Sequence, residues 1–166
     1  MCANETWINI EVYGPQSEIN RLKTLCKKTD VRSFTDEFVI DFTALMPNSN
    51  LGQQYWSWNM LKRGHCKPGS FDFGFDAPGG CPIEIFESLA LEFPTLSFYC
   101  SCIASGDEFM ASGWFNGPPD SPVFEFFEVP PDYWEPGGSS GKTNEAISRH
   151  KDLVARLAHA AFLASQ

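Results

Sequence analysis

Residues 6–15 read TWINIEVYGP, and this stretch sets the fold. Its apolar residues Ile8, Ile10 and Val12 alternate with polar or amphipathic neighbours. Successive side chains of a strand point to opposite faces, so the alternation predicts a β-strand with one buried face. Gly14-Pro15 then ends the strand and places a proline where a helix can begin.

A helix is predicted directly after Pro15, because apolar residues recur there at helical spacing. These residues are Ile19, Leu22, Leu25 and Cys26. Glu18 stands early in the segment and Lys27-Lys28 stands late, as the helix dipole favours. The chain therefore opens with a strand and a helix that each present one apolar side.

The same patterns predict further elements along the chain. They are strands at 38–45, 70–75, 96–103, 109–115 and 123–129, a short aromatic helix at 53–63, and a helix at 82–93. Without the short helix, the first six elements give the order βαββαβ. This order predicts an α+β fold with a ferredoxin-like antiparallel sheet and both helices on one face, extended by an added hairpin strand. Phe71, Phe73 and Phe75 should face the helices, and Asp72 and Gly74 should face away.

The length of 166 residues suits one domain. We expect residues 1–129 to form the ferredoxin-like domain, 130–141 a Pro/Gly-rich loop, and 142–166 a C-terminal helix packed on the same domain. The helix is predicted from apolar residues at helical spacing, namely Ile147, Val154, Leu157, Ala161 and Phe162. We expect no membrane partner, because no stretch approaches the ~20 apolar residues of a membrane span.

The formal net charge of −9 is placed very unevenly. The segment from Pro68 to Gly141 contains twelve acidic residues and no Lys, Arg or His, whereas the rest of the chain holds nine acids and twelve bases. Because nucleic-acid binding depends on clustered Lys and Arg, we expect no direct nucleic-acid contact. An acidic region instead attracts basic surfaces, although it can also serve solubility alone.

A docking surface for a basic protein is the sharper interpretation of this charge pattern. Its candidate partner-binding residues are the acids Asp72, Asp76, Asp107, Glu108, Asp120, Glu125, Glu128, Asp132 and Glu135.

Signatures of catalysis and nucleotide binding are weak. Residues 137–143 read GGSSGKT, yet Pro136 stands where a phosphate-binding loop needs its first glycine. This favours a linker over a nucleotide site. The chain holds no Gly-x-Ser-x-Gly or His-Glu-x-x-His motif, and its three histidines are scattered. We therefore expect a non-enzymatic protein with no cofactor and no catalytic residue.

The chain has six cysteines but no recognisable secretory signal, so reduced thiols in the cytoplasm are expected. Cys100 and Cys102 lie two apart on a predicted strand, share one face and should not bridge each other. A metal site that joins this pair to His65 and Cys66 is the alternative. Zinc sites more often show Cys-x-x-Cys spacing, which favours thiols without metal.

An aromatic segment, Tyr55-Trp56-Ser57-Trp58, lies close to the basic residues Arg63 and Lys67. Tryptophans in such a setting close a core or anchor a protein interface. The alternative function is a small enzyme or ligand-binding domain with a pocket assembled around Trp56, Trp58 and His65.

Several short motifs together resemble the YubB-type ferredoxin-like domain found in plasmid and phage proteins of unknown function. They are Gly14-Pro15 after the opening strand, Tyr55-Trp56-Ser57-Trp58, Phe71-Asp72-Phe73, Ala77-Pro78, Phe93-Pro94 and Leu96-Ser97-Phe98. The resemblance covers roughly Trp7 to Gly117. It implies a ferredoxin-like fold and a mobile-element origin, and it supplies no catalytic residues.

From these observations we expect an acidic protein-binding module of a phage or plasmid. It would inhibit a host defence factor, of the anti-CRISPR or anti-restriction type, by occupying a basic nucleic-acid-binding surface. The sequence leaves the identity of the partner and the oligomeric state open.

Overall fold

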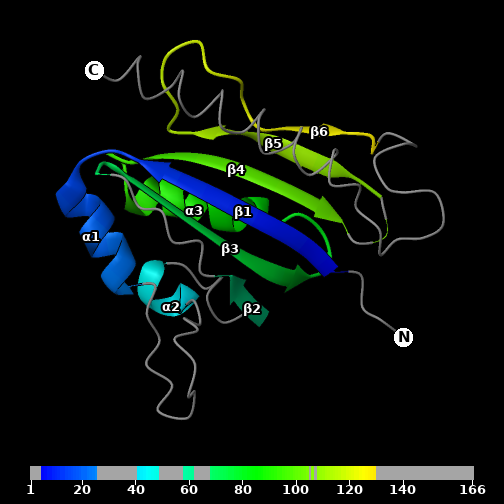
Figure 1. Cartoon of the computed structure of the whole chain (residues 1–166), viewed down its shortest axis with the longest axis horizontal. Coiled ribbons are helices and arrows are strands. Elements are labelled where there is room, and N and C mark those ends of the chain that lie inside the picture. The colour runs from blue at the N-terminus through cyan, green and yellow to red at the C-terminus, as the bar shows by residue number, and fades with distance from the viewer. Residues whose placement is uncertain are drawn as a thin grey trace.

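A computed structural model describes residues 5–25, 41–48, 58–61, 68–104, 106 and 108–129 (Figure 1). Within them the chain forms a six-stranded sheet and three helices. The strands are β1 Glu5–Tyr13, β2 Trp58–Leu61, β3 Ser70–Pro78, β4 Ser97–Ala104, β5 Met110–Phe115 and β6 Glu125–Phe127. The helices are α1 Gln16–Leu25, α2 Phe42–Leu45 and α3 Ile83–Glu92.

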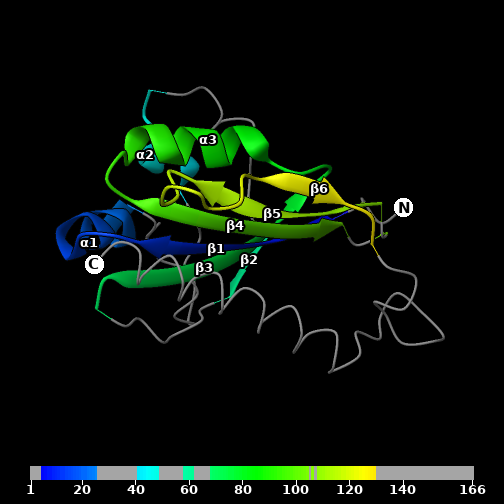
Figure 2. The ribbon, with the colours of Figure 1, turned by 90° about the horizontal axis from the view of Figure 1, so that it is seen from above.

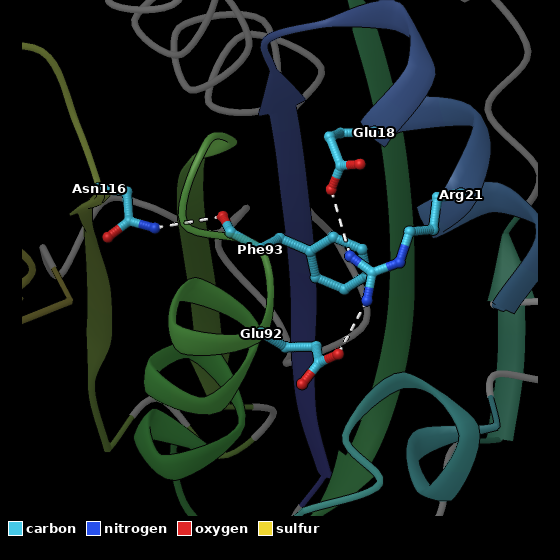
Figure 3. Close-up of polar contacts among 5 residues, drawn as sticks. All are labelled: Glu18, Arg21, Glu92, Phe93 and Asn116. Carbon is cyan, nitrogen blue, oxygen red and sulfur yellow. Dashed lines mark hydrogen bonds and ion pairs between the residues drawn. The ribbon is translucent and has the colours of Figure 1, made fainter.

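The sheet runs in the order β2-β3-β1-β4-β5-β6, and each neighbouring pair is antiparallel. Figure 2 shows α2 and α3 on the same side of this sheet, and α1 joins them on that side in Figure 3. We call this side the helix face and the other side the open face. The predicted α+β class with an antiparallel sheet is confirmed.

The core lies between the helix face and the helices, and β1 runs through its middle. Ile10 stands opposite Phe73 of β3 on one side and Cys100 of β4 on the other, and all three side chains are buried. Helix α3 covers this layer with Ile85 and Phe86. The alternation in residues 6–15 therefore predicted the buried face correctly, because every second residue of β1 enters the core.

The orientation of the phenylalanine strand is also as predicted. Phe73 and Phe75 are buried in the core, and Phe71 packs against it while partly exposed. Asp72 stands opposite Glu11 in the register and so lies on the open face.

Two polar side chains fasten the helix layer (Figure 3). Arg21 of α1 forms ion pairs with Glu18 at 3.2 Å and with Glu92 of α3 at 2.8 Å, and its guanidinium lies 4.5 Å from the centre of the Phe93 ring. Asn116 follows β5 and donates through Nδ2 to the carbonyl oxygens of Ala90 at 2.7 Å and Phe93 at 3.4 Å. The bond to Ala90 satisfies a carbonyl group in the last turn of α3, and the Phe93 carbonyl also accepts the Leu96 N–H at 3.0 Å.

Two predicted elements are wrong. The strand expected at 38–45 is the helix α2 over Phe42–Leu45, because Asp41 caps it: its Oδ1 accepts from the Ala44 N–H at 3.1 Å. The helix expected at 53–63 contains the strand β2, because Trp58 pairs with Asp76 and Leu61 with Gly74 of β3. Residues 38–40, 53–57 and 62–63 lie outside the described residues.

The remaining predictions differ mainly in their limits. The strand expected at 70–75 extends to Pro78, and the strand expected at 123–129 is reduced to Glu125–Phe127. The predicted loop at 130–141 and helix at 142–166 lie outside the described residues and stay predictions.

Replacing Phe73 with Ala should lower the free energy of unfolding by about 3–5 kcal/mol, because it leaves a cavity in a packed core. The matched change on the open face, Asp72→Asn, should cost less than about 1 kcal/mol, since a partly exposed charge contributes little. Urea unfolding of both variants measures the difference. Equal midpoints for the two variants would contradict the orientation of β3.

Candidate protein-interaction surface

Strand β6 forms one edge of the sheet. It pairs with β5 through Met110↔Phe127, Ala111↔Phe126 and Ser112↔Glu125, and among the described strands none lies on its outer side. An edge strand presents unpaired backbone N–H and C=O groups, which makes it a natural place for another chain to dock.

The segment that leads into β6 is fixed closely against β5. Trp114 donates its backbone N–H to the carbonyl of Pro122 at 3.0 Å. Gly113 has φ +152°, and a Cβ built on it would lie 2.3 Å from the Cα of Phe124. A side chain at Gly113 cannot be accommodated, so the sequence uses glycine to let two backbones touch. The segment before β6 is therefore held in place against β5 by direct backbone contact.

Large apolar side chains are exposed along this edge. Val123 is 66% exposed, Phe126 51% and Phe127 47%. The ring of Phe126 contacts Phe124 at 5.9 Å between centroids, and Phe124 contacts Phe86 of α3 at 5.5 Å. The Phe126 ring thus continues a series of aromatic contacts that begins in the core. Clustered apolar side chains left in water are typical of an interaction site.

Carboxylates lie close to these apolar side chains in the sequence. Asp120, Glu125 and Glu128 are all exposed. We define the β6 edge surface as Asp120, Val123, Glu125, Phe126, Phe127 and Glu128. It wraps around the sheet edge: Phe126 stands opposite buried Ala111 and lies on the helix face, whereas Phe127 and Glu125 point to the open face. Its apolar side chains lie next to exposed carboxylates, which we call its acidic rim.

The described residues carry thirteen acids and two bases, a difference of −11, and both bases, Arg21 and Lys23, lie in α1. Helix α1 contacts β3, four strand positions from β6 in the sheet order. Arg21 is also already paired with Glu18 and Glu92. Hence no described base offsets the charge of the β6 edge surface, and its field is negative.

The structure brings only some of the predicted partner-binding acids together. Asp120, Glu125 and Glu128 share the β6 edge surface. Glu108 is exposed in the turn before β5, next to Phe109, whose ring contacts Phe126 at 5.6 Å. It therefore lies at the same edge.

Two of the predicted acids lie elsewhere. Asp72 and Asp76 belong to β3, four strand positions from β6, which is roughly 19 Å at ~4.8 Å per strand. Asp107, Asp132 and Glu135 lie outside the described residues. The single acidic region of the sequence is therefore at least two separate places on the sheet.

A small aromatic cluster lies on the open face. Tyr99 is 1% exposed and Trp114 6%, and Tyr13 packs against them, with ring centroids of Tyr13 and Trp114 5.8 Å apart. Tyr13 donates its hydroxyl to Glu11 Oε2 at 2.6 Å. Burial, then this hydrogen bond and the charges of Glu11 and Asp72, raise the pKa of Tyr13 far above its usual value. Burial likewise raises the pKa of Tyr99.

Of the three residues proposed to form a pocket, Trp56, Trp58 and His65, the structure describes Trp58 alone. Trp58 stands in β2 opposite Asp76 of β3, while Trp56 and His65 lie outside the described residues. Within the described residues, no group of three or more His, Cys, Asp and Glu side chains is arranged to hold a metal ion.

Sequence reasoning missed the exposed phenylalanines of β6. The signal was present, because Phe126 and Phe127 are adjacent and neighbouring side chains of a strand point to opposite faces. Both can be buried only where the two faces of the sheet are covered, whereas the described helices of this fold cover one face (Figure 2).

Comparison with protein-family models, curated proteins and solved structures found no match for the chain. In the part of the chain that the structure describes, no helix is long and apolar enough to cross a membrane.

Gly113→Ala should destabilise the protein by more than about 1–3 kcal/mol, the cost of forcing a residue with a Cβ into this backbone region, because the Cβ also meets Phe124. Gly80→Ala is the matched control, since a Cβ there meets nothing within 4 Å. Thermal unfolding measures both. A Gly113→Ala protein as stable as Gly80→Ala would contradict the close contact between β5 and the segment before β6.

Tyr13 and Tyr99 should stay protonated at pH values where an ordinary tyrosine ionises, about pH 10. Because the folded pKa is raised, their contribution to stability is complete below the unfolded pKa and is lost as the pH rises above it. Absorbance titration should show these tyrosines ionising together with alkaline unfolding. Tyr13→Phe should remove one of these late protons, and an unchanged titration would contradict the assignment.

Proposed function

We propose that the chain is a non-enzymatic binding module that docks its β6 edge surface on a basic protein surface. One observation carries the proposal: Val123, Phe126 and Phe127 are exposed, together with Asp120, Glu125 and Glu128, in the edge strand β6 and the segments beside it. Apolar exposure alone would suit many partners. The acidic rim restricts the choice to a surface rich in Lys and Arg.

The two parts of the surface have different roles in this proposal. The carboxylates attract a basic partner over a distance of about one Debye length, roughly 8–10 Å at physiological salt, and raise the rate of association. The phenylalanines lose contact with water in the complex and slow dissociation. The outer edge of β6 supplies backbone donors and acceptors to the partner.

The partner that we propose is a nucleic-acid-binding host defence factor. Proteins that hold nucleic acid present clustered Lys and Arg, and an acidic surface competes with phosphates for them. The resemblance to YubB-type domains adds a mobile-element origin. The order β4-β1-β3-β2 within the sheet supports the ferredoxin-like class that this resemblance implies. We place the protein in the cytoplasm, where thiols such as Cys81, Cys100 and Cys102 stay free.

The alternative is a small enzyme or ligand-binding domain built around Trp56, Trp58 and His65. No contact among these residues is available to support it, because two of them lie outside the described residues.

The double variant Glu125→Lys/Glu128→Lys should slow association with the partner at least tenfold at low salt, because it reverses the charge of the acidic rim. Glu84→Lys/Glu87→Lys on α3 makes the same change in net charge away from the sheet edge and is the matched control. A pull-down from a host lysate at two salt concentrations identifies the partner. Stopped-flow binding over a salt series then gives the rates.

Equal rates for wild type and the β6 variant would overturn the electrostatic part of the proposal. Equal slowing by both double variants would show that net charge, not this surface, governs binding.

Phe126→Ala/Phe127→Ala should instead accelerate dissociation by at least tenfold, with a smaller effect on association. The matched control is Leu91→Ala, because Leu91 on α3 is 81% exposed and lies outside the β6 edge surface. If both variants release the partner as slowly as wild type, the exposed phenylalanines are not part of the interface.

A further inference from the structure

Two cysteines that are far apart in the sequence meet in the fold. The Sγ atoms of Cys81 and Cys102 lie 3.4 Å apart, although 21 positions separate the residues. Cys81 stands between the end of β3 and the start of α3, and Cys102 lies in β4 on the helix face. Both are free thiols, as is Cys100.

The two thiols differ in their access to water. Cys81 is partly exposed, whereas Cys102 is 5% exposed and Cys100 is fully buried. The hydrogen bond with Cys81, and then burial, raise the pKa of Cys102, and burial raises that of Cys100. Cys81 is therefore the thiol that a dissolved oxidant reaches first, and Cys102 is the thiol next to it.

The chain before Cys81 has room to move. A disulfide needs the sulfurs at about 2.05 Å, so one of them must travel roughly 1.4 Å. Gly79 and Gly80 precede Cys81, are exposed, and have open space within 4 Å of where a Cβ would lie. Cys102 is fixed, because β4 is paired with β1 and β5 on its two sides. Closure therefore requires movement of the short turn and leaves the sheet unchanged.

Helix α3 holds the turn at its start through a backbone bond, in which the Ile83 N–H donates to the Cys81 carbonyl at 3.0 Å. Its N-cap is Pro82, which makes no side-chain capping hydrogen bond. Thr6 holds the turn by donating its hydroxyl to the Gly79 carbonyl at 2.6 Å. The Thr6 hydrogen bond thus anchors the turn before Cys81, and the Cys81 sulfur lies over β4.

We propose that Cys81 and Cys102 are an oxidant-sensitive pair that forms a reversible disulfide and fastens the turn before α3 to β4. This inference does not depend on the proposed binding function. It assigns a covalent modification to two residues that otherwise serve as small core side chains.

The oxidant in this step is a hydroperoxide. The Cys81 thiolate attacks one peroxide oxygen, the O–O bond breaks, and Cys81 becomes a sulfenic acid as the first water forms. The Cys102 sulfur then attacks the Cys81 sulfur, the S–O bond breaks, and the second water leaves with the Cys102 proton. Two thiols lose two electrons, and one hydrogen peroxide is reduced to two waters. A dithiol reductant reverses the reaction by thiol–disulfide exchange.

The test uses the full chain with Cys2, Cys26 and Cys66 replaced by Ser, which leaves the three cysteines of the described core. The protein is treated with hydrogen peroxide and digested without reductant. Trypsin leaves the three cysteines on one peptide, because 68–141 contains no Lys or Arg. A glutamate-specific protease cuts after Glu84, Glu87 and Glu92 and separates Cys81 from the other two.

We expect a linked peptide that lacks two hydrogen atoms, contains Cys81 and Cys102, and separates on reduction. The melting temperature should rise by about 5 °C or more on oxidation, because the link closes a loop in the unfolded chain. Cys100→Ser is the matched control and should keep both effects, whereas Cys81→Ser should lose both.

The proposal is overturned if peroxide converts Cys81 to sulfinic acid without a link, or links Cys81 to Cys100. It is also overturned if Cys81→Ser shows the same rise in melting temperature as its parent. Cys81 is partly exposed, so this variant folds and the comparison stays decisive even if replacement of buried Cys102 impairs folding.

Discussion

The pairing of β1 on both of its sides is the constraint on which the rest of the fold depends. β3 and β4 each pair with nearly its whole length, and Ile8, Ile10 and Val12 enter the core from its middle. Because the register is fixed there, the buried faces of β3 and β4 follow from it: a slip of one residue would turn every apolar side chain to the open face. The helices then cover one face only.

The β6 edge surface is a consequence of this arrangement. The sheet grows outward from β1 through β4 and β5, and apolar cover from α3 decreases along the way: Phe86 reaches Phe115 and Phe124, while Phe126 is left half exposed. Because Phe126 is half exposed to water, it contributes only part of the stabilisation that a fully buried ring would give. In the proposed complex, the partner supplies the cover that α3 does not give Phe126.

The acidic residues show what the order of residues along the chain can predict about a surface. Counting acids between Pro68 and Gly141 predicted one acidic docking surface, and that docking surface stays a prediction. The sequence does not say that β3 and β6 lie at opposite sides of the central strands. Asp72 faces Glu11 and influences Tyr13, whereas Glu125 stands at the sheet edge. Contiguity along the chain is not contiguity in space.

Local side-chain periodicity determined the long elements. A period of two or 3.6 residues is recognisable in each of β1, α1, β3, α3 and β4, because these elements are long enough. The faces on which Phe73 and Ile10 lie followed from this period. Contacts beyond this periodicity decided the short ones: Phe42–Leu45 is capped by Asp41 and packs the Phe42 ring on Phe75 of β3, and Trp58–Leu61 is a strand because β3 offers it an edge. They also decided the strand order, the exposure of Phe126 and Phe127, and the meeting of Cys81 with Cys102. Four residues carry too little pattern to choose a conformation, and no local rule encodes which distant segments will pair.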